Sequence, residues 1–229
     1  MNSGRGYFVT GTDTGVGKTV VTLGLMQWLQ DRGHRVAAMK PVASGCSASP
    51  RGLRNADAVR LRQQAGLDLN YEAVNPCAFE PALAPHIAAA MANRRIDLAE
   101  LERCYARLRG KADRVCVEGI GGWLVPLNER ETVADLAARL GCAVILVAGI
   151  RLGCLNHALL TVAAIRAAGV PLAGWVANCL DARTESVAAV INTLESYIYE
   201  PLLGVVPPLE DPHAAAVAAH LSLQTLDDS

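Results

Sequence analysis

A glycine-rich loop near the N-terminus carries the residue types that bind phosphate groups. The stretch YFVTGTDTGVGKTV covers residues 7–20 and contains a Gly-Lys-Thr triplet. Free N–H groups at a helix start attract phosphate oxygens, and glycines let the backbone approach them closely. Lys18 can then reach the β- and γ-phosphates of a nucleotide, while the hydroxyl of Thr19 can bind Mg²⁺. Gly11 and Gly17 enclose five residues, whereas the common phosphate-binding loop has four, so this loop is a lengthened variant.

The alternative interpretation of this stretch is a plain connector leading into a helix that begins with a lysine. A cation is unfavourable at the positively polarised start of a helix, so a bound anion explains Lys18 better. The order of a β-rich run, the loop and an amphipathic segment is also the structural context that the motif requires.

Short apolar runs alternate along the chain with longer helical patterns, and together they predict the elements that position this loop. This alternation predicts an α/β fold of three layers, with helices on both faces of a mostly parallel sheet. We expect residues 1–229 to form a single domain of the P-loop NTPase type. Ligands bind beyond the carboxyl ends of the strands in such sheets. Strands are predicted at 6–10, 35–39, 113–117, 143–148, 172–177 and 202–206, and helices at 17–31, 55–65, 97–109, 132–140, 155–168, 184–197 and 212–220.

Composition and charge exclude several classes of protein. The formal net charge of −1 gives no basic face, so nucleic acid is not an expected partner. The apolar run 142–150 is too short to span a bilayer, and no signal peptide is visible, so no membrane association is expected. Seven cysteines without a C-x-x-C pair indicate reduced thiols in the cytoplasm.

Three charged residues lie where the predicted topology would bring them together. Lys40 comes directly after the second strand, and a fixed ammonium there would favour an anion formed during a reaction. Asp57 opens a helix and Glu118 ends an apolar strand, and Mg²⁺ takes one or two carboxylates together with phosphate oxygens and water. The alternatives are a solvated lysine at position 40 and a helix cap at position 57. A carboxylate at the end of an inner strand, as at position 118, is costly without a partner.

Six stretches together resemble the dethiobiotin synthetase family, and the lengthened loop is that family's form. The resemblance implies Mg²⁺- and ATP-dependent carboxylation and ring closure of 7,8-diaminopelargonic acid with CO₂. The reaction passes through a carbamate and a carbamic-phosphoric anhydride and gives dethiobiotin, ADP and phosphate in the penultimate step of biotin synthesis. The stretches are GTDTGVGKT (11–19), MKPVASG (39–45), LRNADA (53–58), VEGIGGWLVP (117–126), RLGCLNHALLT (151–161) and AGWVAN (173–178).

The resemblance also implies roles for particular residues and a homodimer in which the second subunit holds the substrate's distal carboxylate. Lys40 and Lys18 would be catalytic, and Thr19, Asp57 and Glu118 would bind the metal. The nucleotide would contact Gly15, Val16, Gly17, Lys18, Thr19, Val20, Asp57, Glu118, Gly119, Gly121, Asn178, Pro207, Pro208 and Leu209. The substrate would contact Thr14, Lys40 and Ser44 together with Leu152, Gly153, Cys154 and Asn156.

Several residues of the loop region keep more than one interpretation. The resemblance places Thr14 near the substrate, whereas Asp13 can instead hold the loop by accepting local N–H bonds. Ser44 can donate to the carbamate or the γ-phosphate, or can be an ordinary loop serine. Gly15 stands where the family often has an acidic residue, which removes one possible contact.

The segment 151–161 also keeps alternatives. Its helix start offers free N–H groups for an anion, as the resemblance implies. Asn156 can instead cap the helix. Cys154 and His157 can form a nucleophilic pair, although placement on one turn supports this weakly.

The residues at the end of one predicted strand allow two interpretations of how the nucleotide base is bound. The amide of Asn178 can donate to and accept from an adenine edge. Asn178 and Asp181 also have the Asn-x-x-Asp spacing with which GTPases bind guanine, but Cys179 replaces the usual lysine of that motif. Many members of the family carry an acidic residue at this position, so its absence leaves the preference for the base open. The residues 207–209 either line the base pocket, as the resemblance implies, or form a rigid turn.

Regulatory ATPases of the partitioning type are the main alternative function, because they share the fold and a Gly-Lys-Thr loop. They typically carry a second lysine early in that loop, and no residue between Gly11 and Gly17 is basic. An amidotransferase-linked synthetase of the cobalamin pathway would need a glutaminase domain, for which 229 residues leave no room. A simple nucleotide-binding module remains only if Lys40, Asp57 and Glu118 do not converge.

Overall fold

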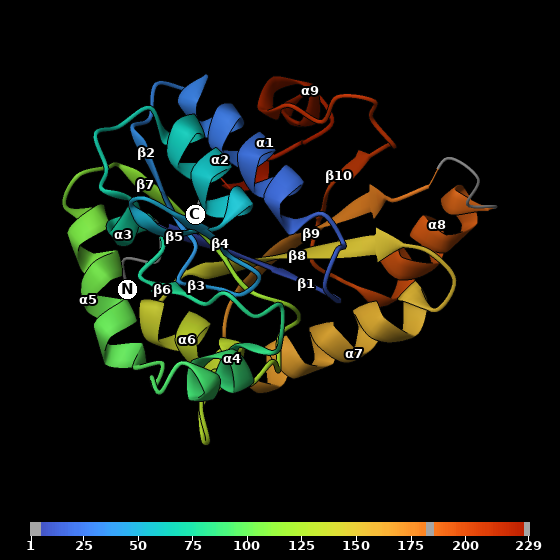
Figure 1. Cartoon of the computed structure of the whole chain (residues 1–229). Coiled ribbons are helices and arrows are strands. Elements are labelled where there is room, and N and C mark those ends of the chain that lie inside the picture. The colour runs from blue at the N-terminus through green and yellow to red at the C-terminus, as the bar shows by residue number, and fades with distance from the viewer. Residues whose placement is uncertain (1–5, 182–185, 227–229) are drawn as a thin grey trace.

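The computed structural model describes residues 6–181 and 186–226, and a parallel sheet of six strands lies at its centre (Figure 1). Every pair of neighbouring strands in this sheet is parallel. The glycine-rich loop follows β1, a strand inside the sheet whose residues are all buried because helices cover both faces. The strands lie in the order β10 (Leu202–Val206), β9 (Leu172–Cys179), β8 (Ala143–Ile150), β1 (Gly6–Gly11), β7 (Arg114–Glu118) and β2 (Val36–Met39).

Helices form a layer on each face of the sheet, as Figure 1 shows. Trp175 of β9 is fully buried against one face of the sheet, in one hydrophobic cluster with Leu146 and Leu194. The predicted three-layer α/β fold is therefore confirmed. One layer contains α1 (Lys18–Gln30), α2 (Ala56–Ala65) and α9 (Ala214–Ala218), and the other contains α5 (Leu98–Arg109), α6 (Val133–Leu140), α7 (Cys154–Ala167) and α8 (Val187–Tyr197).

The strand register places the ends of several strands at one edge of the sheet. Val9, near the end of β1, lies opposite Glu118, the last residue of β7. On the other side of β1, Asn178 of β9 lies opposite Val206, the last residue of β10. The loops that leave these strands therefore meet at the carboxyl edge, where ligands of such sheets bind.

The predicted long elements are present, with ends that differ from the predictions by no more than three residues. Residues 184 and 185, the first two of the predicted helix 184–197, lie outside the described residues. α7 begins at Cys154 with Gly153 as its N-cap, one residue before the predicted start. Asn156 lies inside the first turn, so the alternative interpretation of Asn156 as the cap of this helix is wrong.

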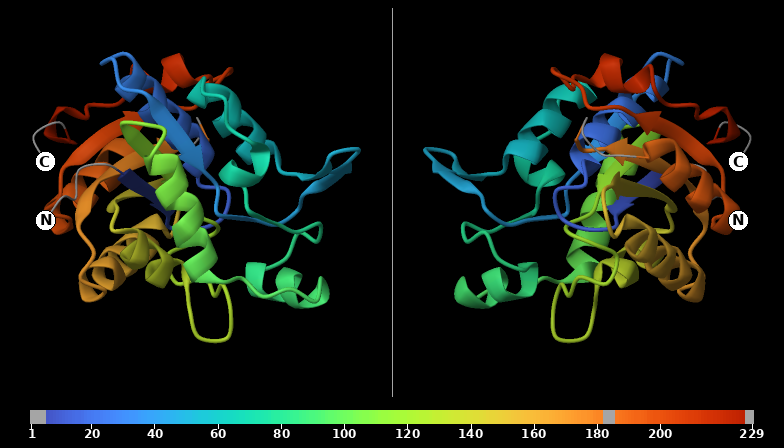
Figure 2. Two further views of the ribbon diagram at one scale, coloured as in Figure 1. Left: turned by 90° about the vertical axis from the view of Figure 1, so that its left-hand side faces the viewer. Right: turned by 90° about the vertical axis from the view of Figure 1, so that its right-hand side faces the viewer.

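Short elements between the long ones are not predicted from the sequence, because each has too few residues for a periodic pattern. The hairpin of β4 and β5 projects from the body of the molecule (Figure 2). Within the described residues, no helix has the length and the apolar character that crossing a bilayer requires. All seven cysteines lie in the described ranges, and each is a free thiol. The short elements are β3 (Val42–Ala43), paired with β6 (Cys77–Ala78), the hairpin of β4 (Ser47–Ser49) and β5 (Gly52–Arg54), α3 (Tyr71–Val74), α4 (Pro85–Met91) and the 3-10 helix η1 (Gln224–Leu226).

Candidate active site

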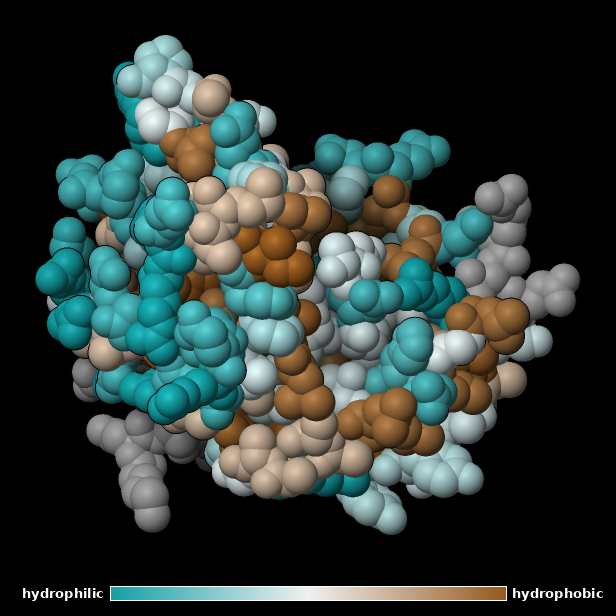
Figure 3. All heavy atoms as spheres, turned by 60° about the horizontal axis from the view of Figure 1, so that its bottom comes forward, coloured by the Kyte–Doolittle hydropathy of each residue, from teal (hydrophilic) through white to brown (hydrophobic). Residues whose placement is uncertain are grey.

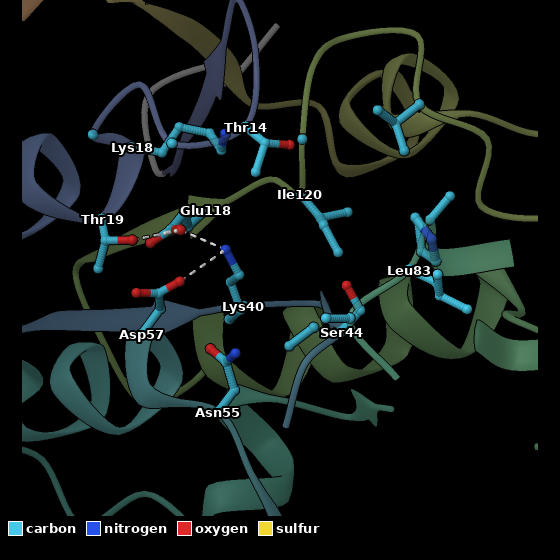
Figure 4. Close-up of a pocket in the computed structure, with 18 of the residues that line it drawn as sticks. Thr14, Lys18, Thr19, Lys40, Ser44, Asn55, Asp57, Leu83, Glu118 and Ile120 are labelled. Atoms are coloured by element: carbon cyan, nitrogen blue, oxygen red, sulfur yellow. Dashed lines mark hydrogen bonds and ion pairs between the residues drawn. The ribbon is translucent and has the colours of Figure 1, made fainter. Parts of the chain in front are cut away.

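A cavity of about 850 Å³ lies at the carboxyl edge of the sheet. The glycine-rich loop and the start of α1 form one side, and the residues after β2, the start of α2 and the end of β7 form the others (Figure 4). The predicted site residues that line it are Thr14, Gly15, Gly17, Lys18, Thr19, Val20, Lys40, Ser44, Asp57, Glu118 and Gly121.

The glycine-rich loop is held from β9. Gly17 precedes α1 with φ of 91°, and a Cβ atom at this position would lie 2.1 Å from Asn178 Nδ2. The same amide nitrogen donates a hydrogen bond of 2.8 Å to the carbonyl of Val16. Val16 is buried and does not line the cavity. The loop therefore needs glycine at position 17, and Asn178 contacts the loop itself.

Lys18 is the first residue of α1 and is buried beneath the loop. Its Nζ donates a hydrogen bond of 2.8 Å to the backbone carbonyl of Asp13. Burial, and then the nearby charge of Lys40, lower the pKa of Lys18 to about 8. A phosphate anion between these two cations would favour their charged forms.

Lys40 and two carboxylates meet on the opposite side of the cavity, as Figure 4 shows. Lys40 Nζ lies 2.5 Å from Glu118 Oε1 and 3.8 Å from Asp57 Oδ2. It also donates to the carbonyl of Gly119 over 3.1 Å, and Thr19 Oγ1 donates to Glu118 Oε1 over 2.9 Å. Residues from four separate segments of the chain therefore converge, which is the arrangement that a simple connector or a non-catalytic module would not need.

The oxygen atoms of this cluster fit a hard cation. Glu118 is 1 % exposed, and its Oε2 accepts no hydrogen bond from the described residues. Asn55 caps α2 by accepting from the N–H of Ala58 over 3.1 Å, so the alternative interpretation of Asp57 as the helix cap is wrong. Among the described residues no three His, Cys, Asp or Glu side chains form a metal-binding group. Two carboxylates and a hydroxyl instead match Mg²⁺, which keeps positions for phosphate oxygens and water.

Asp13 holds the loop and also binds an arginine from another segment. Its Oδ1 accepts from the N–H of Thr14 over 2.7 Å, and its Oδ2 accepts from Arg151 over 2.6 Å. The Thr14 hydrogen bond, and then the guanidinium of Arg151, hold the pKa of Asp13 below its usual value. The interpretation of Asp13 as a loop-holding residue is confirmed by these contacts, whereas Thr14 lines the cavity.

The start of α7 does not reach the cavity of its own chain. Leu152, Gly153, Cys154 and Asn156 are absent from the cavity lining. Leu152 is fully exposed, while the side chain of Cys154 is buried in the core beside α8. His157 is exposed, and no hydrogen bond joins it to Cys154 in the described part of the chain. The geometry therefore gives no support to a Cys154–His157 nucleophilic pair.

The residues predicted to contact the base lie beside the cavity rather than in its lining. Asn178 is buried, and Cys179 beside it is buried as well. The segment 207–209 follows β10 at the same edge, and Leu209 packs against the core. Gly119 also lies outside the lining, and its role in the structure is to accept from Lys40.

Several residues of the site were not found by sequence reasoning. Arg60 lines the cavity one turn after Asp57, a spacing that could have revealed it. Asn55 precedes a helix, as capping residues do. The segment 82–85 and the side chains of Ile120 and Val125 form an apolar wall, and nothing in their residue types indicates chemistry. Arg151 was missed because its partner Asp13 lies 138 positions away.

The loop between β1 and α1 presents backbone N–H groups and a lysine to a cavity that two carboxylates also line. This arrangement defines a P-loop nucleotide-binding protein. A family model described as an AAA domain matches residues 5–216. The fold is similar to that of the septum site-determining protein MinD of Pyrococcus horikoshii (TM-score 0.54, 18% identity, 98% of this chain and 90% of that chain). It is also similar to a chain of the Aquifex aeolicus MinC:MinD complex (TM-score 0.58, 12% identity, 98% and 95%).

Curated relatives define the family more narrowly. The chain is 50% identical over 221 residues to the ATP-dependent dethiobiotin synthetase BioD of Pseudomonas paraeruginosa, covering 96% of this chain and 97% of the relative. Identity to the enzyme of the same name from Cellvibrio japonicus is 50% over 228 residues, with 99% and 100% coverage. For BioD 1 of Escherichia coli O157:H7 it is 45% over 221 residues, with 96% and 98% coverage. The chain therefore belongs to the ATP-dependent dethiobiotin synthetases, ligases of biotin biosynthesis, and the likeness to MinD concerns the fold alone.

Proposed function

We propose that the cavity binds Mg²⁺-ATP next to 7,8-diaminopelargonic acid and converts the diamine and CO₂ into dethiobiotin, ADP and phosphate. The observation that carries this proposal is the convergence of Lys40, Glu118, Asp57 and Thr19 on one cavity with the phosphate-binding loop. We also propose that residues 1–229 act as one domain, since the loop and Glu118 lie at the ends of strands of one sheet and Asp57 lies on α2, which packs against that sheet. The free thiols fit a protein of the reducing cytoplasm.

The nucleotide phosphates would lie on the backbone N–H groups of the loop and the start of α1. Lys18 would exchange its hydrogen bond to the Asp13 carbonyl for one to the β- and γ-phosphates. The base would lie toward the end of β9 and the segment 207–209, which share the carboxyl edge with the loop.

Thr19, Asp57 and Glu118 would hold Mg²⁺, because their oxygens face one another and Glu118 Oε2 has no other partner among the described residues. The ion would offset the negative charge of the phosphate oxygens. The preference of Mg²⁺ for few protein ligands agrees with the small number of carboxylates present.

Lys40 would stabilise the carbamate that forms when one amine of the substrate bonds to CO₂ and loses a proton. An ammonium has three donors, and two of them go to Glu118 and Gly119, which leaves one for an anion in the cavity. The carbamate oxygen then bonds to the γ-phosphorus while the bond to ADP breaks. The second amine attacks the carbamate carbon and loses a proton, and the bond between this carbon and the phosphate oxygen breaks, so phosphate leaves as the ring closes. Lys40 offsets the charge at each stage.

The rest of the cavity suits the remaining parts of this substrate. Thr14 and Ser44 supply hydroxyl groups near the reacting end, whereas Leu83, Ile120 and Val125 form an apolar wall. Figure 4 shows Leu83 and Ile120 on the side of Lys40 that faces away from Thr19. An aliphatic chain is the part of the substrate that gains from contact with such a wall.

The distal carboxylate of the substrate would be bound by a second subunit, at the start of its α7. This segment is exposed and does not line the cavity of its own chain. Leu124 and Leu160, both exposed, line a hollow of about 410 Å³ together with Thr12 and Asp13 of the loop. An apolar surface next to the phosphate-binding loop is where a partner subunit would complete the site.

ADP release tests the proposal when it is measured with Mg²⁺ and bicarbonate, with and without the diamine. We expect turnover to require the diamine and to stop when EDTA removes Mg²⁺. Lys40→Ala should lower kcat at least about 100-fold while ADP still binds, and the exposed Lys111→Ala should match the wild type. ATP turnover that ignores the diamine would favour a regulatory ATPase, and an active Lys40→Ala variant would remove Lys40 from the mechanism.

A further inference from the structure

Arg60 lines the nucleotide cavity although neither the motif nor the family resemblance points to it. It lies three residues after Asp57 on α2, so both side chains project from the same face of the helix. Thr19 and Val20 of α1 line the cavity as well. Arg60 therefore lies at the end of the cavity that α1 and α2 enclose.

The packing of the two helices directs Arg60 toward the cavity. Their C-terminal ends are tied together, since Gln30 Nε2 donates to the Gln64 carbonyl and Gln64 Nε2 donates to Gln30 Oε1, each over 2.7 Å. Both helices begin at the cavity, with Lys18 and Asp57 in their first turns. Side chains on a helix lean toward its N-terminus, so the side chain of Arg60 extends toward the cavity that it lines.

The charges in the cavity lining leave Arg60 available for an anion. Lys40 is paired with Glu118 and Asp57, and Lys18 donates to a loop carbonyl. Arg60 donates to the carbonyl of Pro212 over 3.4 Å, which is long for a hydrogen bond. In the described ranges 6–181 and 186–226 it forms no ion pair.

The position of Pro212 indicates which part of the nucleotide Arg60 meets. Pro212 lies in the connection between β10 and α9, three residues after Leu209, the last residue of the segment 207–209 that is proposed to bind the base. Lys40 marks the opposite end of the ligand, where the γ-phosphate reacts. In the proposed site, Arg60 would therefore lie between the base and the reacting phosphate.

We propose that Arg60 is a nucleotide-binding residue whose guanidinium contacts the α- and β-phosphates of ATP. This inference rests on the proposed nucleotide site. A planar guanidinium can donate two parallel hydrogen bonds to phosphate oxygens, and the weak contact to Pro212 is readily exchanged for them.

Calorimetric titration with Mg²⁺-ADP, Mg²⁺-ATP and adenosine tests this role in the full-length protein. Arg60→Ala should raise Kd for ADP and for ATP by about the same factor, roughly five- to tenfold, and leave adenosine binding unchanged. Arg60→Lys should be intermediate, because it keeps the charge but not the planar fork. The loss should shrink at high ionic strength. Arg60→Gln keeps a donor for Pro212 and tests the charge separately.

Arg62→Ala is the matched control, because Arg62 is exposed on the same helix and does not line the cavity. The inference is overturned if Arg60→Ala and Arg60→Gln bind nucleotides as Arg62→Ala does, or if they lose affinity for ATP but not for ADP. Lys18→Ala separates this failure from a failure of the proposed site. If Lys18→Ala weakens ADP binding while the Arg60 variants do not, only the role of Arg60 is wrong.

Discussion

Three charged side chains of the cavity are buried, namely those of Lys18, Lys40 and Glu118. Glu118 lies at the end of an inner strand and is buried, yet it accepts from both Lys40 and Thr19. A buried carboxylate without such partners would be very costly. The cluster is therefore stable only as a set, and each member constrains the position of the others.

Lys18 gives a pH dependence to nucleotide binding. Its pKa is lowered to about 8, and a bound phosphate favours the charged ammonium and raises that pKa again. Free protein above pH 8 has largely lost this proton, so binding must take one up. We expect affinity for ADP to fall about tenfold from pH 7 to pH 9.

Calorimetry in buffers of different ionisation enthalpy measures this proton uptake. Near pH 8.5 the wild type should take up a proton on binding ADP. Lys18→Arg should not, because a guanidinium stays charged throughout this range. Proton release by the wild type, or an unchanged affinity at pH 9, would contradict the assignment of the effect to Lys18.

The sequence predicts the place of a site residue where that residue lies at the end of a strand. Lys40 and Glu118 directly follow or end buried strands, so the topology alone predicts that they meet. Arg60 lies in no motif, and Arg151 begins the stretch 151–161 although its type does not reveal its contact with Asp13. Their contacts depend on how neighbouring helices and loops pack, which a single sequence does not reveal.

At the scale of elements, one ion pair joins the phosphate-binding loop to the start of α7. Asp13 and Arg151 are about half-exposed, and their atoms lie 2.6 Å apart. Such a pair contributes little to global stability, typically less than about 1 kcal/mol. We expect the pair instead to position the turn that carries Leu152 and Gly153, which directly follow Arg151.

Arg151→Ala tests this positioning. Because the start of α7 is proposed to bind the carboxylate of the diamine, we expect KM for the diamine to rise roughly three- to tenfold. KM for ATP and the melting temperature should change little. Arg166→Ala is the control, since Arg166 forms a 2.6 Å pair with Glu200 near the other end of α7. Equal effects of the two substitutions on KM would reject a positioning role.

Elements are predictable from the sequence where they are long. The strands of the main sheet read as apolar runs because they are buried on both faces, and the long helices carry a clear periodicity. The hairpin β4–β5 and the helix α4 have no such pattern, and α4 begins at Pro85, the last residue of the segment 82–85 that lines one side of the cavity. The apolar wall was therefore missed together with the element that positions it.

The whole molecule presents an apolar surface on the side of α4 and α7. Figure 3, in which the bottom of Figure 1 comes forward, shows hydrophobic side chains gathered on this side. The exposed residues there include Leu83, Ile87 and Met91 of α4 and its approach, and Leu152 and Leu160 of α7 and its approach. A surface of this kind next to the active site suits a second copy of the chain.

Leu160→Asp tests the proposed dimer. The side chain is 62 % exposed, so the substitution should not disturb the core, but a charge in an apolar interface should shift the protein to monomers. Light scattering after gel filtration measures the mass. The monomer should still bind Mg²⁺-ADP yet lose at least about 90 % of its diamine-dependent turnover, because an incomplete site no longer positions the substrate.

Tyr197→Asp is the control, because Tyr197 is 60 % exposed at the end of α8 and lies outside the surface defined above. It should leave the mass and the turnover unchanged. A fully active Leu160→Asp monomer would mean that one chain contains the complete site.

The contact between Asn178 and the loop limits how this enzyme can be redesigned. The amide fills the space that a side chain at position 17 would need, and it also fixes the carbonyl of Val16. In the proposed base site, a replacement of Asn178 that is meant to admit a different nucleobase would also remove its hydrogen bond to the phosphate-binding loop. Under that proposal, base selectivity and phosphate affinity would be coupled through one side chain, and a variant that changes only the selectivity would need a compensating change in the loop.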